Sequence, residues 1–227
     1  IGSTSSSFNL ISGNVLNGIL IQGASAQGTT VVNNRIGTNK VGDAAIPNSG
    51  DGIVVSGTTK ITIGGSSASA RNTIGGNQHG IHITNSSSQI TVLGNHIGFF
   101  YTGSDYNNIG NQQDGIRINN SSNVVIGGTL SGMGNVISGN RAGVHMTNSS
   151  TVTLQGNFIG TNQDGSASGS TLYNGQNSSG AGITILAGSG YTIGGTTVAD
   201  RNIIADDATG ILFSATVFNT TTGARAI

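Results

Sequence analysis

Several residue types are missing or rare in this chain of 227 residues. It has no cysteine, no tryptophan and no glutamate, and it has a single proline. Without cysteine the chain can form no disulfide and offers no thiol as a nucleophile or metal ligand. No apolar run approaches the roughly 20 residues that a membrane span needs, so we expect no membrane insertion.

Charge is scarce as well. Charged residues make up 7% of the chain, and eight Lys and Arg residues balance eight Asp residues to a formal net charge of zero. Nucleic-acid binding depends on clustered basic residues that displace counterions, so this composition argues against a nucleic-acid partner. It also argues against a polybasic contact with a membrane surface.

The abundant residues are those of strands and turns. The chain has 39 glycines, many Ile and Val residues, and long stretches of Ser, Thr and Asn. Strong helix formers are few, and β-branched residues favour strands. The composition therefore predicts an all-β fold with many turns.

A short phrase, Gly-Ile-x-Ile or a close variant, recurs along the whole chain. Its intervals of 34, 28, 35, 28, 39 and 28 residues alternate between long and short. Each unit holds two further strand-like pieces, and three short strands joined by turns close one coil of a solenoid whose coils stack about 4.8 Å apart. We expect about seven such coils in one domain, residues 1–227. The phrases are GILI at 18, GIVV at 52, GIHI at 80, GIRI at 115, GVHM at 143, GITI at 182 and GILF at 210.

Strand alternation predicts which side chains face inward. In the third, fourth and fifth copies of the phrase, Ile81, Ile116 and Val144 should be buried and stacked on one another. The residue that follows each of them should point outward.

Asparagine recurs at one position in every coil. An Asn side chain both donates and accepts hydrogen bonds, so a stack of them can satisfy backbone groups at the turns and bond to the next coil. We predict a structural ladder and no metal site, because amides need carboxylates beside them to hold a hard cation. The ladder residues are Asn9, Asn34, Asn72, Asn95, Asn135, Asn157 and Asn202. A second row is expected five residues further on, at Asn14, Asn39, Asn77, Asn140, Asn162 and Asp207, with Phe100 interrupting it.

These repeats resemble those of the right-handed parallel β-helix proteins of the pectin-lyase-like superfamily. The resemblance covers essentially the whole chain and rests on phrases at 33–39, 64–77, 127–140 and 156–162. It implies a right-handed parallel β-helix with three short strands per coil, in a secreted or cell-surface protein. In enzymes of this superfamily the outward face of a parallel sheet commonly carries the site. This sequence lacks the clustered Asp residues of pectate lyases, the GHG motif of polygalacturonases and the DPHD motif of alginate epimerases, so the resemblance names no activity.

Titratable residues gather on one outward strip in the middle of the chain. Three of them directly precede the glycine of successive phrases, and three others lie three residues after that coil position on successive coils. Two Asp residues two coils apart would lie roughly 9 to 10 Å from each other, near the upper limit for an inverting carboxylate pair. The competing interpretation is ordinary turn chemistry and solubility. The candidates are Asp51, His79 and Asp114 in the first group, His82, Arg117 and His145 in the second, and Arg141 nearby.

Two further features allow a functional and a structural interpretation. Phe99, Phe100, Tyr101 and Tyr106 cluster in one long loop, where they could stack on a sugar or form a local loop core. A row of Thr residues could match an ice lattice, although solvent-facing Thr is also common on strands. That row comprises Thr30, Thr62, Thr91, Thr153 and Thr192, with Val125 in the gap.

The sequence favours a structural or adhesive function. Both ends, residues 1–14 and 216–227, align with the interior of a coil. We therefore expect the chain to be a fragment of a longer repeat protein, with the flanking repeats as its partners. We predict a stiff, non-catalytic module that presents loops, with polysaccharide as the candidate ligand and no cofactor. A polysaccharide lyase, hydrolase or epimerase acting on the strip is the alternative, and an ice-binding solenoid is a more distant one.

Overall fold

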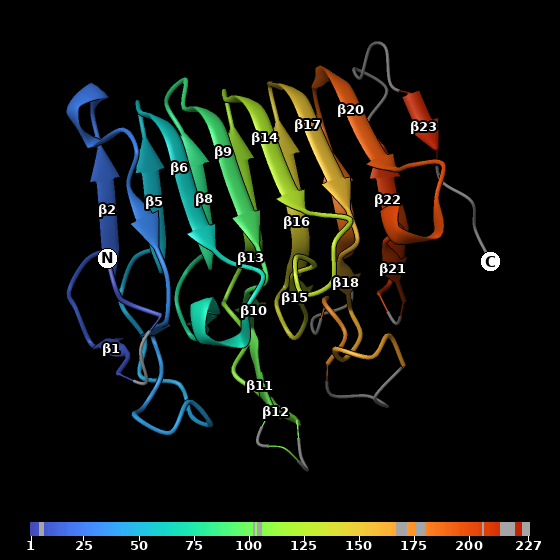
Figure 1. Ribbon diagram of the computed structural model, residues 1–227. Helices are drawn as coiled ribbons and strands as arrows, with labels where there is room; N and C mark the ends of the chain where they lie inside the picture. Colours follow the sequence, from blue (N-terminus) through green and yellow to red (C-terminus); the bar gives the residue numbers. More distant parts are fainter. Residues whose placement is uncertain are drawn as a thin grey trace.

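The chain folds into a right-handed parallel β-helix in a computed structural model that describes residues 1–4, 7–101, 103, 106–166, 172–175, 180–205, 207–213 and 221–223. Its coils stack in chain order from one end to the other (Figure 1). Each coil contributes one strand to each of three parallel sheets, and each sheet has seven strands among the described residues. The expected architecture of about seven three-stranded coils is therefore confirmed.

The three sheets correspond to the three strand-like pieces of the sequence repeat. The first sheet comprises β2 (Ile19–Gln22), β5 (Ile53–Ser56), β8 (Ile81–Thr84), β13 (Asp114–Asn119), β16 (Ala142–Thr147), β19 (Ala181–Ile185) and β22 (Thr209–Phe213). The second comprises β3 (Thr30–Val31), β6 (Thr59–Gly64), β9 (Ser88–Leu93), β14 (Ser122–Gly127), β17 (Ser149–Gln155), β20 (Gly188–Gly194) and β23 (Thr221–Gly223). The third comprises β1 (Asn9–Ile11), β4 (Asn34–Ile36), β7 (Thr73–Ile74), β10 (His96–Ile97), β15 (Val136–Ile137), β18 (Phe158–Ile159) and β21 (Ile203–Ile204).

The connections hold the remaining short elements. Three 3-10 turns occur at Ala24–Ala26, Ala68–Ala70 and Val198–Asp200. One long connection forms an antiparallel hairpin, β11 (Phe99–Tyr101) with β12 (Tyr106–Asn108), that projects from the coil edge (Figure 1). No helix among the described residues is long and apolar enough to cross a membrane.

The core follows the register that the repeat predicts. Ile116 pairs with Ile81 on one side and with Val144 on the other, and all three are fully buried. Inward-facing Ile, Val and Leu side chains of the three sheets form one continuous cluster along the β-helix. Because each coil covers the apolar side chains of the next, burial is the main force that stacks the coils.

In six of the seven repeat phrases the opening glycine is required by close packing, and Gly210 of the last phrase is the exception. A Cβ atom on Gly115 would lie 2.6 Å from Cγ2 of Ile137 and 2.9 Å from Nδ2 of Asn140. These distances are too short for any side chain. The recurring glycine therefore makes room for the third sheet and for the asparagines beside it.

The first asparagine ladder is confirmed. Nδ2 of Asn95 donates to Oδ1 of Asn135 at 3.0 Å, and Nδ2 of Asn135 donates to Oδ1 of Asn157 at 3.0 Å. From Asn34 onward the ladder amides also bond to backbone; Nδ2 of Asn135, for example, donates to the Val92 carbonyl at 2.8 Å. The same side-chain bond links every neighbouring pair of the row Asn9, Asn34, Asn72, Asn95, Asn135, Asn157 and Asn202.

The second row differs from the expectation, because its members on the long coils lie after the loops and not before them. Asn39 and Asn162 instead bond within their own loops, to Asp43 and Ser166, and Phe100 lies in the hairpin. Fixed spacing fails wherever a loop is inserted before the ladder position. The structure joins Asn14, Asn48, Asn77, Asn111, Asn140, Asn174 and Asp207 into an unbroken row.

Candidate functional site

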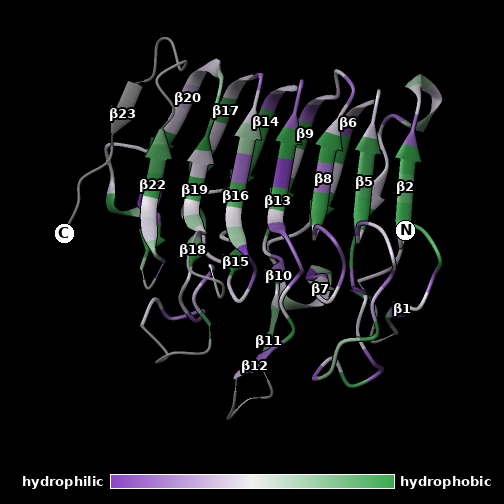
Figure 2. Ribbon diagram, turned by 180° about the vertical axis from the view of Figure 1, so that it is seen from behind, coloured by the Kyte–Doolittle hydropathy of each residue, from purple (hydrophilic) through white to green (hydrophobic). Residues whose placement is uncertain are grey.

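The titratable residues of the predicted strip lie together on the outward face of the first sheet. Asp51 lies two residues before β5, His79 lies two residues before β8, and Asp114 is the first residue of β13. Within the strands, Arg117 pairs in register with His82 on one neighbouring coil and with His145 on the other. The hydrophilic segments of β8, β13 and β16 lie side by side in Figure 2.

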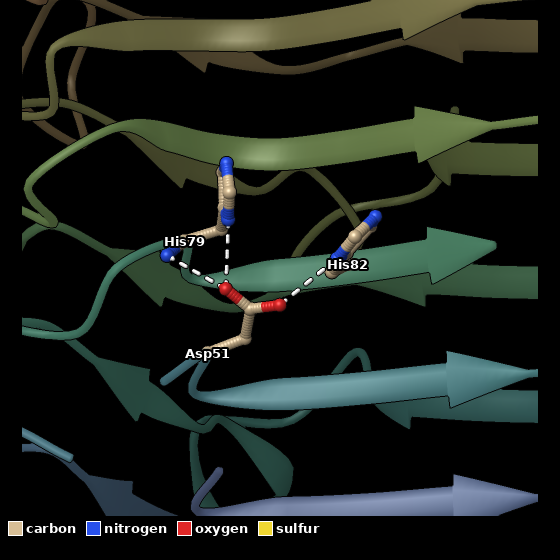
Figure 3. Close-up of side chains that lie close together, drawn as sticks. All are labelled: Asp51, His79 and His82. Carbon is tan, nitrogen blue, oxygen red and sulfur yellow. Dashed lines mark hydrogen bonds and ion pairs between the residues drawn. The ribbon is translucent and has the colours of Figure 1, made fainter. Parts of the chain in front are cut away.

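Asp51 accepts hydrogen bonds from two imidazole rings. Its Oδ1 lies 2.7 Å from Nδ1 of His79, and its Oδ2 lies 2.9 Å from Nδ1 of His82 (Figure 3). A carboxylate only accepts, so both Nδ1 atoms carry the hydrogen. The backbone fixes the same pair, since the His79 amide donates to Oδ1 of Asp51 at 3.1 Å.

Asp114 gathers three cations or imidazoles around one oxygen. Its Oδ2 lies 3.2 Å from Nη1 of Arg117, 3.6 Å from Nε2 of His79 and 3.6 Å from Nδ1 of His145. The first is a hydrogen bond, and the other two are longer electrostatic contacts. His79 therefore connects the Asp51 group to the Asp114 group. We call Asp51, His79, His82, Asp114, Arg117 and His145 the strip cluster.

Both carboxyl groups are buried and strongly favour their ionised form. Asp51 and Asp114 are 8% and 5% exposed. Burial by itself raises the pKa of Asp51, but hydrogen bonds and charge from His79 and His82 outweigh it and hold that pKa far below the ordinary value. For Asp114, burial is likewise outweighed by His145, His79 and Arg117, which lower its pKa.

This arrangement limits the acid–base chemistry that the two carboxylates can perform. An inverting glycosidase needs a water molecule and the sugar between its two carboxyl groups. Here the His79 ring lies between them, with Nδ1 toward Asp51 and Nε2 toward Asp114. A general acid also needs a raised pKa, whereas both of these are lowered.

The outer imidazoles each keep one nitrogen without a hydrogen-bond partner. Nε2 of His82 and Nε2 of His145 are both buried and unbonded, while their Nδ1 atoms face the carboxylates. With the hydrogen on Nδ1, a neutral ring presents a lone pair at Nε2. These two lone pairs are therefore unsatisfied in the structure.

Arg141 does not join the strip cluster. It immediately precedes Ala142, which pairs with Asp114, but the Arg141 side chain is exposed. No hydrogen bond or ion pair links it to the cluster in the part of the chain that the structure describes.

Two polar neighbours that support the strip cluster escaped the sequence analysis. Oδ1 of Asn17, one coil before Asp51, accepts the Asp51 amide at 2.9 Å. Asn119 accepts from Nε of Arg117 at 3.2 Å once its amide is turned to place oxygen toward the guanidinium. The strand period of two could have identified Asn119, because it lies two residues after Arg117 on the same face.

A cavity of about 570 Å³ lies on a different part of the surface. Arg71, His96, Phe158 and Arg201 line it, together with the turn at residues 128–134, and no member of the strip cluster does. His96 is almost fully buried there, and desolvation followed by the charge of Arg71 lowers its pKa well below the ordinary value.

The four loop aromatics do not form a single open platform. Phe99 is fully buried and packs with Val136 and Leu172 in a small local core. Tyr101 and Tyr106 stack on each other, with ring centroids 4.7 Å apart, and cover that core. Strand alternation turns Phe100 to the opposite side, where its ring lies 5.4 Å from the guanidinium carbon of Arg35.

The threonine row lies in register on the second sheet. Thr62 pairs with Thr30 and Thr91, and exposed Val125 separates Thr91 from Thr153 as expected. The outward positions two residues earlier differ from coil to coil, from Lys60 to Gln89 to Asn123. Over the described side chains, the second sheet therefore presents one line of hydroxyl groups and no regular second line beside it.

Comparison with known proteins adds no family to this description. The chain matches no protein-family model, no curated protein and no solved structure.

Proposed function

We propose that this chain is a stiff, non-catalytic structural or adhesive module of a secreted or cell-surface protein, whose outward face binds polysaccharide weakly. We also place it in the pectin-lyase-like superfamily. The repeated phrases and the parallel β-helix support that placement.

One observation carries the non-catalytic part of the proposal. The His79 ring separates Asp51 from Asp114, and both carboxylates are already paired with cations or imidazoles. Catalysis by a carboxylate pair would require the displacement of His79 and a large rise in one pKa. In this arrangement the paired side chains stabilise the contact between adjacent coils, and the ionised carboxyl groups have no proton to donate.

Rigidity supports the adhesive part. Two asparagine ladders and three sheets connect every coil to the next, so outward side chains on successive coils keep a spacing of about 4.8 Å. His82, Arg117 and His145 form such a row above the buried carboxylates. A row of polar groups at fixed spacing suits a linear polymer with repeated hydroxyl groups, and Arg117 can donate to carboxylates on such a polymer.

The test is a panel of acidic and neutral polysaccharides, scored for binding by affinity electrophoresis and for turnover by new reducing ends and unsaturated products. We expect weak binding to an acidic polysaccharide and no turnover. Arg117→Ala should weaken that binding, whereas Arg201→Ala, which removes an exposed arginine elsewhere, should leave it unchanged.

Two results would contradict the proposal. Turnover that is abolished in both His79→Ala and Asp114→Asn would establish a polysaccharide lyase, hydrolase or epimerase. Absence of binding across the panel would contradict the proposal that the ligand is a polysaccharide.

A further inference from the structure

We propose that Asp51, His79 and His82 form a binding site for a divalent transition-metal ion such as zinc. The proposal does not depend on polysaccharide binding, because the site is defined by these three side chains alone.

The ligand atoms are already close together. One oxygen of Asp51 and the two imidazole nitrogens lie within 4.8 Å of one another, and Figure 3 shows both rings turned toward the carboxylate. Zinc bonds to imidazole and carboxylate are about 2.0 to 2.2 Å long, so ligands in a tetrahedral site lie about 3.4 Å apart. Coordination through Nδ1 requires that the single ring hydrogen of each histidine lie on Nε2, together with side-chain shifts on the order of 1 Å.

The surroundings of His79 provide an independent indication. Its side chain is 9% exposed, and its buried Nε2 makes no hydrogen bond, yet Oδ2 of Asp114 lies 3.6 Å away. Histidines that bind metals through one nitrogen usually donate the other N–H to a carboxylate. A small ring shift on metal binding would give His79 this arrangement, with Asp114 held in place by Arg117.

The coil register pre-positions the ligands. The Gly52 amide donates to the His79 carbonyl at 2.8 Å, and the Ile53 amide donates to the Gly80 carbonyl at 3.0 Å. These bonds fix the segment of Asp51 against the segment of His79 and His82. The site therefore spans two adjacent coils, and a bound ion would fasten them together.

The donor set selects the type of metal. Two imidazoles and one carboxylate suit zinc and its neighbours among the divalent transition metals. Calcium and magnesium prefer a shell of oxygen ligands, which one carboxylate does not supply. Three protein ligands also leave a fourth position for water or for an exogenous ligand.

The neighbouring Asp114 and His145 provide a matched comparison. They too are an aspartate and a histidine on adjacent coils, with Nδ1 and Oδ2 3.6 Å apart. Arg117 contacts the same oxygen of that carboxylate, Oδ2, and Thr184 pairs with His145 on the next coil. A cation there would meet the guanidinium, so we assign the metal to the Asp51 side alone.

The experiment is a calorimetric titration of the chelator-treated chain with zinc, with calcium and magnesium as negative controls. We expect a single zinc site per chain and a higher melting temperature with zinc present. His82→Ala and Asp51→Asn should abolish binding, His145→Ala should retain it, and Asp114→Asn should weaken it by about 10- to 100-fold.

A second measurement keeps the proposal testable if a ligand variant fails to fold. Cobalt(II) bound to the unaltered chain should show the visible absorption of a four-coordinate site with nitrogen and oxygen ligands. Absence of zinc binding, absence of that absorption, or zinc binding that survives both His79→Ala and His82→Ala would overturn the proposal.

Discussion

Replacing Asn135 by Leu tests the asparagine ladder at its most buried part. Asn135 is fully buried, and leucine has a similar size but can neither donate nor accept. The substitution removes the acceptor of the Asn95 amide, which lies 3.0 Å from Oδ1 of Asn135. It also removes the donor to the Val92 carbonyl, at 2.8 Å. Two buried backbone groups would then have no partner.

The magnitude follows from those two groups. An unsatisfied buried donor or acceptor costs about 1 to 3 kcal/mol, so the free energy of unfolding should fall by about 2 to 6 kcal/mol. For a chain of this length that loss corresponds to a fall in melting temperature of about 4 to 24 °C. Thermal unfolding followed by circular dichroism measures it.

Asn9→Leu is the matched control. Asn9 belongs to the same ladder but is exposed, so water can replace its bond to Asn34. We expect it to cost less than about 1 kcal/mol. Equal melting temperatures for the Asn135 variant and the unaltered chain would refute the ladder as a source of stability. Equal losses in the two variants would refute the role of burial.

Two further predictions concern the second ladder and the buried carboxylates. Asn111→Leu should lower the free energy of unfolding by about 1 to 3 kcal/mol for each buried group that it leaves unpaired. Asn39→Leu should cost less, because Asn39 bonds within an exposed loop. The opposite order in urea unfolding would place Asn39, and not Asn111, in the second ladder, as the sequence spacing predicts. The pKa values of Asp51 and Asp114 are lower in the folded chain than in the unfolded chain. The two carboxylates therefore stabilise the fold fully above the unfolded pKa near 4, and this stabilisation is lost as pH falls below that value. The free energy of unfolding should decline in that range. The decline should be shallower in a variant that carries Asp51→Asn and Asp114→Asn, and an unchanged slope would show that these carboxylates add no stability.

Sequence periodicity predicted the fold because one rule governs every coil. Side chains such as Ile81, Ile116 and Val144 must stack wherever inward positions recur, and the loops between them do not change that requirement. Counting five residues forward from each Asn of the first ladder did not locate the second ladder on the long coils. Insertions precede Asn48, Asn111 and Asn174, so spacing along the chain no longer equals position on the coil.

The sequence predicted most of the residues of the candidate site but not the contacts between their side chains. Alignment of the repeats brought His79 between Asp51 and Asp114, and the structure places it there. Alignment could not show that the ring would fill the space between the carboxylates, because that depends on side-chain rotamers. It also could not exclude Arg141, which lies one residue before the position that pairs with Asp114.

Stacking also explains why acidic and imidazole side chains alternate along one row of this strip. Residues at one coil position lie about 4.8 Å from their equivalents on the next coil, so a row of like charges would repel. Here Asp51, His79 and Asp114 occupy one row, with an imidazole between the two acids, while His82, Arg117 and His145 occupy the row beside it. Each carboxylate is thus paired along its own row and across to the next. Removing one of these partners would weaken the pairing of a buried carboxylate, which costs more than the loss of one exposed ion pair. The strip cluster must therefore be considered as a unit, whether it serves to hold coils together, to bind a polymer or to bind a metal ion.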